Sequence, residues 1–401
     1  MIQIKDKSLC SGCTACKSVC PKNCISMCED KEGFLYPKVD TSVCINCCLC
    51  EKVCPIINQI EKKLESTQKG FVVSHTDDNI RKESTSGGAF TAIAEWVLNK
   101  QGVVFGAAFD EDLVVRHQYV ENKEELSKFR NSKYVQSEMG DSLVLVKRFL
   151  EQERWVCFSG TPCQIEGCYT FLNKAYKRLI LVDVMCRAVP SPKVLRMYLK
   201  DQADKYGRIE KCFFRDKSIY GYKYSQLVLK NERGDVLYHN GIDTDKWLRI
   251  FFSGIANRPS CYHCKFRKRY RVSDFTLWDC FEPGKYSKEL DDNKGATRVL
   301  VHSVKGLDIL ASIKKMRMVE IDPNTLIGSF KQVSSSIPLN NKRERFFDDL
   351  DLFDFRYVAK KYFPNTLSVF IERSLRKIAH KWGIYKIVRS VFKKLFGEKK
   401  R

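Results

Sequence analysis

The sequence contains little that would place the chain in or across a membrane. It has no apolar run of about 18 or more residues, the length that a helix needs to span a bilayer. The first residues, MIQIKDKSLC, lack a basic segment followed by an apolar core, so we expect no signal peptide. Both absences predict a cytoplasmic protein.

Side chains for acid–base or nucleophilic catalysis are also scarce. The chain has only 6 scattered histidines, and no Ser-His-Asp set or convincing acid–base pair stands out. A surface or core position explains each histidine more simply, including His117 and His302 in the strand- and helix-rich region. We therefore expect the chemistry to come from bound cofactors, which the protein positions and shields from water.

Cysteine, in contrast, is abundant. The chain has 19 cysteines, an odd number in a long chain that is expected to be cytoplasmic, which favours metal binding over a disulfide framework. Two stretches near the start, CSGCTACKSVCP (10–21) and CINCCLCEKVCP (44–55), repeat one pattern. Both read C-x2-C-x2-C-x3-C-P, the pattern of bacterial ferredoxins that hold two iron–sulfur clusters.

In that pattern three close cysteines bind one [4Fe–4S] cluster and the fourth binds the other. The first predicted ligand set is Cys10, Cys13, Cys16 and Cys54. The second is Cys44, Cys47, Cys50 and Cys20. Zinc could use the same residues, but the doubled spacing with Pro21 and Pro55 favours iron. Cys24, Cys28 and Cys48 lie outside the pattern, and we expect them to be small buried apolar residues.

Composition divides the chain into three regions. Residues 1–60 are predicted to form a two-cluster ferredoxin domain of α+β type, and the polar segment 59–70 is predicted to be a linker. Residues 70–335 are long enough for a large domain. Residues 340–401 are basic and aromatic, which predicts a helical tail.

The middle region alternates strand and helix patterns. Apolar, β-branched runs predict strands at 70–75, 103–109, 154–160 and 178–186. Segment 84–102 predicts a helix that Ser84, Thr85 or Ser86 caps and Gly102 ends. A second helix is expected after residue 186, entered through prolines. The alternation predicts an α/β fold with a mainly parallel sheet.

Ligands of such sheets bind beyond the carboxyl ends of the strands. Gly87-Gly88, Cys163 and Cys186 each follow a predicted strand, so we expect them at one edge of the sheet. Gly87-Gly88 opens a helix, whose backbone N–H groups could hold a phosphate. An ordinary N-cap would look the same in the sequence.

A second set of cysteines is a candidate for a third cluster. Its members are Cys163, Cys186, Cys261 and Cys264, and four thiolates are the usual number of ligands for a [4Fe–4S] cluster. Spacing alone leaves another interpretation open. Cys163 and Cys186 could be buried strand ends, and Cys261 and Cys264 could form half of a zinc site with His263.

Several segments carry a family resemblance. They are STSGGAFTAIAEWVL, GVVFGAAFDEDLVVRH, RNSKYVQSEMGD, FSGTPCQIEG, LVDVMCRAVPSPKV, FFRDKSIYGY and RPSCYHCKF. From about residue 70 to 335 the chain resembles the coenzyme F-420 hydrogenase/dehydrogenase beta subunit family, and its start resembles the ferredoxin fusion of many members. The resemblance implies an FAD and one [4Fe–4S] cluster in this domain. It also implies FAD contacts near Ser86, Gly87, Gly88, Lys133, Tyr134 and Thr161.

Two segments depart from the family pattern. Cys186-Arg187-Ala188 stands where members commonly have Cys-His-Gly, and residues 278–282 read WDCFE where members have Gly-Asp-Phe-Trp-Gly. Both segments are expected near the redox site, so the carrier can differ from the deazaflavin F-420, and Cys280 is a candidate substitute ligand. The chain looks more like a subgroup associated with surface-polysaccharide gene sets, which suggests a glycan-related substrate.

A flavin exchanges two electrons with a hydride donor and single electrons with clusters. We therefore expect an FAD- and [4Fe–4S]-dependent oxidoreductase that acts on a redox carrier or small molecule. The alternative is an electron-transfer subunit without its own substrate, docked on a larger redox complex. A zinc-bearing nucleic-acid binder is disfavoured by the ferredoxin spacing, and no nucleic-acid partner is expected.

The formal net charge is +22, and part of it lies in residues 367–401. An apolar face is predicted from Ile371, Leu375, Ile378, Trp382, Tyr385, Val388, Phe392 and Leu395. Basic residues beside it are Arg376, Lys377, Lys381, Lys386, Arg389, Lys393 and Lys394. Such a helix suits the anionic inner face of a membrane, or it docks on its own domain. A second basic run, 264–271, is expected to attract FAD phosphates, a polyanionic carrier or an acidic partner.

Overall fold

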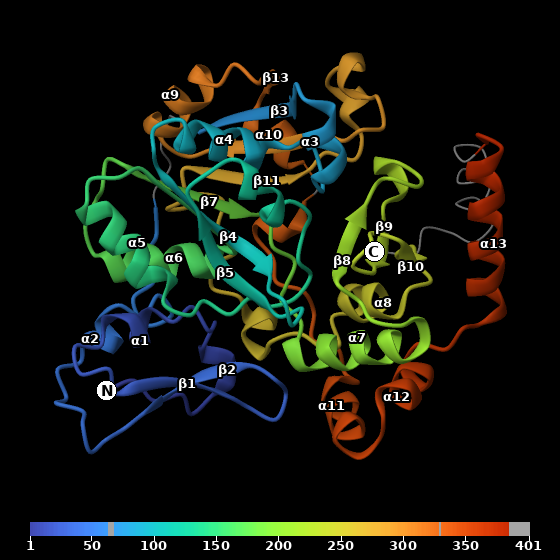
Figure 1. Ribbon diagram of the computed structural model, residues 1–401. Coiled ribbons are helices and arrows are strands. Elements are labelled where there is room, and N and C mark those ends of the chain that lie inside the picture. The colour runs from blue at the N-terminus through green and yellow to red at the C-terminus, as the bar shows by residue number, and fades with distance from the viewer. Residues whose placement is uncertain (63–67, 329, 385–401) are drawn as a thin grey trace.

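The computed structural model describes residues 1–62, 68–328 and 330–384 (Figure 1). The N-terminal domain contains η1 (Lys7–Leu9), α1 (Ala15–Val19), β1 (Ile25–Glu29), β2 (Leu35–Val39) and α2 (Leu49–Lys52). Strands β1 and β2 pair antiparallel, with Ile25 opposite Val39. The domain therefore has the α+β composition predicted for it.

An eight-stranded sheet forms the centre of the molecule. Its order is β13-β3-β12-β11-β7-β6-β4-β5. The strands are β3 (Lys69–His75), β4 (Val103–Phe109), β5 (Val115–Val120), β6 (Val156–Gly160), β7 (Leu179–Val184), β11 (Phe275–Asp279), β12 (Thr297–Val301) and β13 (Met316–Ile321). The predicted α/β class is confirmed. The central strands β4, β6, β7 and β11 are parallel, and the flanking pairs are antiparallel.

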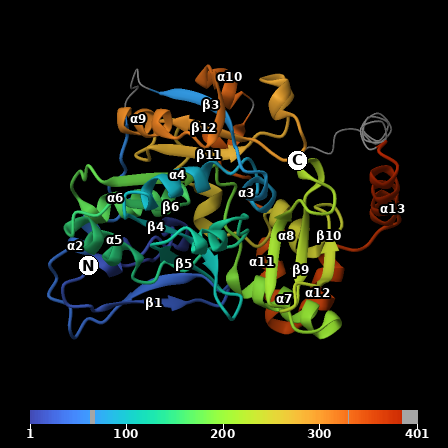
Figure 2. The same ribbon diagram turned by 45° about the horizontal axis from the view of Figure 1, so that its top comes forward.

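Helices cover both faces of this sheet (Figures 1 and 2). On one face α4 (Ala89–Leu98) and α9 (Val304–Ser312) pack on the apolar side chains of the sheet, and on the other α5 (Ser142–Glu151) and α6 (Pro162–Leu172) do so. The shorter α3 (Asp78–Glu83) and α10 (Pro323–Ile327) lie near β3. The N-terminal domain joins the α5–α6 side, because Cys13, Ala15 and Val53 belong to the same apolar core.

A smaller unit lies beside the sheet. Its three strands are β8 (Lys211–Asp216), β9 (Gln226–Lys230) and β10 (Val236–Asn240), and its helices are α7 (Pro192–Tyr206), α8 (Lys246–Ser253), α11 (Arg343–Leu352) and α12 (Phe355–Tyr362). Trp247, Tyr198, Phe214 and Phe346 are fully buried in its core. The first two helices of the predicted tail, α11 and α12, thus pack inside the globular body.

The remaining elements are short. They are η2 (Glu124–Phe129), η3 (Tyr222–Tyr224), η4 (Pro259–His263), η5 (Pro283–Lys285), η6 (Lys288–Leu290) and η7 (Lys331–Val333). The last described helix, α13 (Leu367–Lys381), stands at the side of the molecule (Figures 1 and 2). Of the helices in the described ranges, none has the length and apolar character of a membrane span.

One detail of the predicted helix 84–102 was wrong. None of Ser84, Thr85 and Ser86 caps α4. The Ser84 hydroxyl donates to the Ile80 carbonyl at the end of α3, and the other two hydroxyls bond elsewhere. Gly88 is the residue before the helix, with φ +84°, and no side chain caps it. The hydroxyls do not cap α4 because Ser84 bonds within the end of α3, and Thr85 and Ser86 bond to Ser132 and Thr297, which are distant in the sequence.

Several predicted residues fall outside the described ranges. In the linker these are residues 63–67. In the tail they are Tyr385, Lys386, Val388, Arg389, Phe392, Lys393, Lys394 and Leu395.

Candidate functional site

The first predicted ligand set surrounds one hollow of the N-terminal domain. Cys10, Cys13, Cys16 and Cys54, here called quartet one, line an opening of ≈ 370 Å³. Burial, followed by the neighbouring thiols, raises the pKa of Cys16 to about 12. Cysteines that bind a metal must lose their thiol protons, and burial makes that loss unfavourable. A positively charged metal centre would offset this cost.

The second predicted set surrounds another hollow of the same domain. Cys20, Cys44, Cys47 and Cys50, here called quartet two, line an opening of ≈ 350 Å³. Each hollow thus receives three cysteines from one motif and the fourth from the other. This is the crossed arrangement that the spacing predicts.

The two motifs also repeat in the backbone. Gly12 and Asn46 occupy equal positions and have φ +72° and +52°. Thr14 and Cys48 are the next equal pair, with φ +64° and +57°, and each precedes a short helix. Left-handed residues at these points turn the chain around each hollow, and glycine and asparagine tolerate that conformation best.

The three cysteines outside the pattern differ in their surroundings. Cys24 is buried as expected, and its Sγ lies 3.3 Å from that of Cys20 on the wall of the second hollow. For Cys28 and Cys48 the prediction of burial was wrong, because both are exposed. Cys28 lies on the two-stranded sheet β1–β2, and Cys48 forms the turn before α2. A strand in so thin a domain has one face open to solvent.

The third cysteine set is brought together at the edge of the large sheet. Cys163 and Cys186 follow the parallel strands β6 and β7, and Cys261 and Cys264 lie in and just after η4. Burial raises the pKa of Cys163, Cys186 and Cys261 to about 12, and in each case another thiol of the set adds to the shift. These four residues are called the inner quartet.

Arginines surround the inner quartet. Arg267 donates to the carbonyl oxygens of Cys186 and Arg187. Arg271 forms a buried ion pair of 2.9 Å with Asp183 on β7. These side chains supply positive charge next to thiolates, which lowers the electrostatic cost of a negatively charged metal centre.

The same contacts revise the expectation for the basic run 264–271. Lys268 pairs with the buried Glu166 at 3.0 Å, and Arg269 donates to Gln68 and Asn324. With Arg267 and Arg271 also bonded inside the protein, the run is mostly internal structure. Composition alone cannot reveal this, because the partners are distant in the sequence.

A single-metal site is not formed by the residues that the structure describes. No group of three or more His, Cys, Asp or Glu side chains there is arranged to hold one ion. His263, which joined Cys261 and Cys264 in the zinc alternative, is exposed. Thiols around a cluster stand farther apart than ligands of one zinc ion, whose Zn–S bonds are about 2.3 Å.

The residues expected to contact FAD lie along the same sheet edge. Strands β3, β11 and β7 run in one direction, so Gly87-Gly88 and Cys186 are found at one edge. Gly87 is packed tightly: a Cβ there would lie 2.6 Å from the Val73 carbonyl, and its N–H donates to Thr297 Oγ1. Gly87 is therefore needed for close packing. The backbone N–H groups that could bind a ligand are those at the uncapped start of α4.

Lys133 and Tyr134 lie on a loop beside that helix start, since Ser132 bonds to Thr85. Lys133 Nζ donates to two backbone carbonyls, and burial lowers its pKa to about 7. Tyr134 stacks on Phe251 with centroids 4.3 Å apart. Thr161 begins α6 and lies 3.1 Å from Cys163 Sγ.

A polar network beside the loop was not predicted from the sequence. Asp279, at the end of β11, accepts hydrogen bonds from Arg215 and Tyr222, and Arg215 also donates to Tyr134. Phe281 stacks on Tyr222 at 5.8 Å and is 48% exposed. The segment FFRDKSIYGY contains Arg215 and Tyr222, but their partner Asp279 lies about 60 residues further along the sequence.

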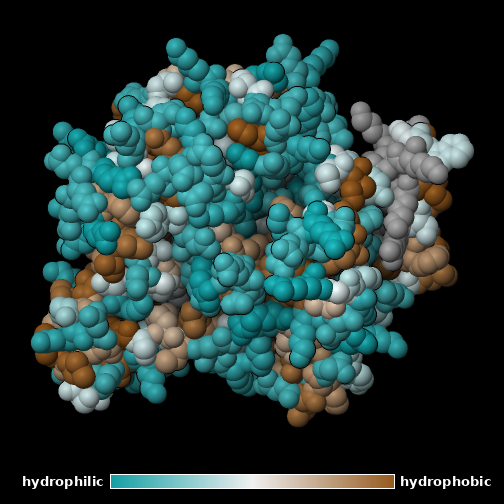
Figure 3. Space-filling model, viewed as in Figure 1, coloured by the Kyte–Doolittle hydropathy of each residue, from teal (hydrophilic) through white to brown (hydrophobic). Residues whose placement is uncertain are grey.

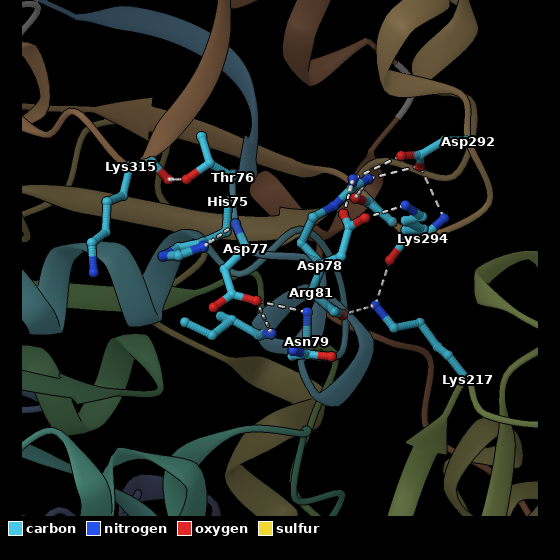
Figure 4. Close-up of polar contacts among 12 residues, drawn as sticks. His75, Thr76, Asp77, Asp78, Asn79, Arg81, Lys217, Asp292, Lys294 and Lys315 are labelled. Carbon is cyan, nitrogen blue, oxygen red and sulfur yellow. Dashed lines mark hydrogen bonds and ion pairs between the residues drawn. The ribbon is translucent and has the colours of Figure 1, made fainter.

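A second unpredicted network fixes the loop before α4 (Figure 4). Lys217 donates to the carbonyl oxygens of Arg81, Ser86 and Lys294, and burial lowers its pKa to about 7. Arg81 forms a two-pronged ion pair with Asp292 at 2.7 Å. The loop that carries Ser86, Gly87 and Gly88 is thus held from two sides.

Cys280 is separate from the inner quartet. It is fully buried in an apolar cluster with Trp278, Leu290 and Leu300. Burial raises the pKa of its thiol, with Arg298 as the neighbouring charge. The structure thus gives Cys280 a place in the core of the sheet.

Fold and site together define an α/β protein with three cysteine quartets of the kind that bind iron–sulfur clusters. Residues 153–326 match the family model that describes the C terminus of the beta subunit of coenzyme F420 hydrogenase/dehydrogenase. This segment, which makes up less than half of the chain, is similar to that family of oxidoreductase subunits.

Beyond this family the similarity to known proteins is low. No curated protein matches the sequence. Among solved structures, a chain of the F420-reducing [NiFe] hydrogenase complex from Methanosarcina barkeri matches with 15% identity and a TM-score of 0.44. That match covers 71% of this chain and 92% of the other.

Proposed function

We propose that the chain is an iron–sulfur flavoprotein oxidoreductase that passes electrons between [4Fe–4S] clusters and FAD, to or from a two-electron carrier or substrate. The observation that carries the proposal is the grouping of twelve cysteines into three quartets, each in the composition expected for one cluster. Bound FAD would supply the change from two-electron to one-electron chemistry.

The uncapped start of α4 supports an FAD site. Backbone N–H groups at a helix start attract phosphate, and no side-chain oxygen competes there. Lys133 lies on the neighbouring loop and can supply positive charge. Lys217 would hold the Ser86–Gly88 loop in place, and Tyr134 and Thr161 would face the cofactor from the strand-end side.

The carrier is proposed to be the deazaflavin F-420 or another two-electron donor, and surface-polysaccharide synthesis is the proposed setting. Arg187 stands where the family commonly has histidine. Its guanidinium lies over the Phe252 ring at 5.6 Å and donates to the Phe252 carbonyl. A side chain held in this way cannot act as a histidine would, which favours a carrier other than F-420.

The test is the composition of protein purified without oxygen. We expect about twelve irons, about twelve sulfides and one FAD per chain, because each quartet would hold four of each inorganic atom. About eight irons without flavin would leave only the N-terminal quartets as cluster sites. Zinc in place of iron would overturn the proposal.

A partner redox protein is favoured by one surface feature. Val43 and Ile45, next to Cys44 of quartet two, are 46% and 56% exposed, and apolar colour gathers over the N-terminal domain in Figure 3. Exposed apolar patches next to a redox centre suit transient docking. We propose that this face receives the partner, whether the chain acts alone on a substrate or as a subunit.

We also propose that α13 contacts the anionic inner face of a membrane. Its apolar residues Leu367, Phe370 and Ile378 are 75%, 65% and 51% exposed, and Trp382, just after its end, is 73% exposed. In the sequence from residue 367 onward, basic residues greatly outnumber acidic ones. A helix with exposed apolar side chains among basic residues fits an anionic lipid surface.

A further inference from the structure

Arg258 is a buried cation at the junction between the N-terminal domain and the large sheet. Its side chain is fully buried, and within the described chain its hydrogen-bond acceptors include no carboxylate. They are the Cys10 and Leu35 carbonyl oxygens, Gln136 Oε1 and, at 3.5 Å, Cys10 Sγ. A buried charge without a carboxylate is costly unless another negative group faces it.

Two sets of thiols can supply that negative charge. Cys10 belongs to quartet one and touches Arg258 directly. On the other side, the Arg258 charge acts on the thiols of Cys163 and Cys261 of the inner quartet. Arg258 therefore lies between quartet one and the inner quartet.

Helix α6 makes a second connection between the same two quartets. It carries Cys163 in its first turn and Gly167 one turn later, and residues four apart share a face of a helix. A Cβ on Gly167 would lie 2.7 Å from Cys13 Cβ and 2.9 Å from Cys13 Sγ. Quartet one thus lies about one helical turn, roughly 6 Å of rise, from the inner quartet along α6.

Quartet two has no such connection in the described structure. All residues that line its hollow come from the first 50 residues of the chain. Cys47 is exposed, as are Ile45 and Cys48 beside it. The three quartets are therefore arranged in a row, with quartet one in the middle.

We propose that Arg258 and Gly167 hold quartet one next to the inner quartet, so that electrons pass between the flavin domain and quartet two only through quartet one. This inference rests on the proposed function. With clusters bound by the quartets, each transfer would move one electron, oxidising one cluster and reducing the next, without making or breaking a bond. The two-electron carrier would supply or take up the electrons through bound FAD.

Arg258 acts in this arrangement as a positioning residue. Its charge favours the more negative, reduced state of a cluster bound by Cys10, and its bonds to the Cys10 and Leu35 carbonyls fix quartet one against the sheet edge. Gly167 leaves room for Cys13 to approach α6. Any larger side chain there would push the two quartets apart.

The order can be tested by removing one quartet at a time. One variant carries Cys13→Ser with Cys16→Ser, and its counterpart carries Cys44→Ser with Cys47→Ser. Each protein is purified without oxygen, assayed for iron and flavin, and illuminated with EDTA to photoreduce the bound FAD. Electron paramagnetic resonance then reports which clusters are reduced.

We expect quartet two to stay oxidised in the first variant, although dithionite reduces it directly. In the counterpart we expect quartet one to be reduced as in the wild type. Equal photoreduction of quartet two with and without quartet one would overturn the inference. Wild-type protein lacking iron or flavin would instead overturn the proposed function, so the two failures are distinguishable.

Arg258→Met tests the positioning role separately. With iron content unchanged, we expect at least a tenfold fall in the reduced-to-oxidised ratio of quartet one at a fixed potential, equivalent to about 59 mV for one electron. Arg258→Lys should restore part of the shift. The control Arg208→Met removes a charge whose side chain is 87% exposed and should change nothing. An unchanged potential in Arg258→Met would refute the role.

Gly167→Ala keeps the inference testable if Arg258→Met does not fold. We expect weaker magnetic coupling between the reduced clusters of quartet one and the inner quartet, seen as narrower resonance lines. Tyr169→Ala, on the same helix with a 39% exposed side chain, is the control. Unaltered coupling in Gly167→Ala would contradict the close contact through α6.

Discussion

At the scale of single residues, the most informative group is the amine of Lys133. Burial lowers its pKa from 10.5 to about 7, so the side chain is charged below neutral pH and mostly neutral above it. If it faces the FAD phosphates, affinity for FAD must be highest at low pH. The affinity for FAD falls as the pH rises because only the protonated amine attracts the phosphates.

We therefore predict that the affinity for FAD falls by about tenfold or more between pH 6 and pH 8.5, the loss of one ion pair worth about 1.4 kcal/mol. Titration of FAD into flavin-depleted protein, followed by flavin fluorescence, measures this. Lys133→Met should bind FAD weakly at both pH values. A wild-type affinity that rises with pH would contradict a contact between Lys133 and the phosphates.

Cys24 leads to a second prediction at this scale. Its thiol lies 3.3 Å from that of Cys20 on the wall of the second hollow, so it can replace Cys20 as the fourth ligand. We predict that Cys20→Ser keeps about the wild-type iron content, whereas Cys20→Ser with Cys24→Ser loses about four irons. Iron analysis of both proteins decides the point.

Quartet one provides the matched control. Its hollow is lined by four cysteines and no fifth, so Cys54→Ser should lose iron by itself. Retention of all iron in the Cys20–Cys24 double variant would show that neither thiol is needed in the second hollow.

The sequence predicted the residues whose roles can be recognised from local spacing. The crossed quartets of the N-terminal domain follow from two short motifs, and the strand-end cysteines follow from the order of strands and helices. Arg258 and Lys217 could not be found in this way, because their partners lie more than 70 residues away. The inward pairing of the basic run 264–271 was missed for the same reason.

At the scale of elements, α13 differs from every other long helix in leaving its apolar side chains exposed. Phe370 and Ile378 are 65% and 51% exposed. Burying a large apolar side chain contributes roughly 1.5–3 kcal/mol. Loss of both contacts should therefore weaken binding to a lipid surface by about a hundredfold or more.

We predict that Phe370→Glu with Ile378→Glu abolishes binding to vesicles that contain phosphatidylserine, measured by sedimentation. The matched control is Leu339→Glu with Leu352→Glu, which changes two residues that are 62% and 75% exposed elsewhere on the molecule. The control should bind as the wild type does. Equal binding by both double variants would exclude α13 as the contact.

At the scale of the whole molecule, the two parts of the chain depend on metal to different degrees. The large sheet has extensive apolar cores on both faces. In the N-terminal domain, the apolar cluster around the hollows buries Ile2, Cys24, Ile25 and Cys50, and the other buried apolar residues of the domain belong to cores shared with the rest of the molecule. So small a core needs bound metal for stability.

We predict that removal of iron by a chelator opens the N-terminal domain while the sheet stays folded. Trypsin should then cut first after Lys52, in the helix beside quartet two, and residues from 69 onward should persist. Mass spectrometry of the fragments identifies the first cut. A first cut within the large sheet, with Lys52 still protected, would contradict the prediction.

The exposed position of quartet two also determines how the protein would respond to air. Oxygen reaches the outermost hollow first, since Cys47 lies at the surface, whereas Cys163 and Cys186 are only partly exposed. Under the proposed function, a protein damaged in this way would still exchange hydride with its carrier but could no longer pass electrons to a partner. Exposure to oxygen would thus stop electron delivery before it damaged the proposed flavin site.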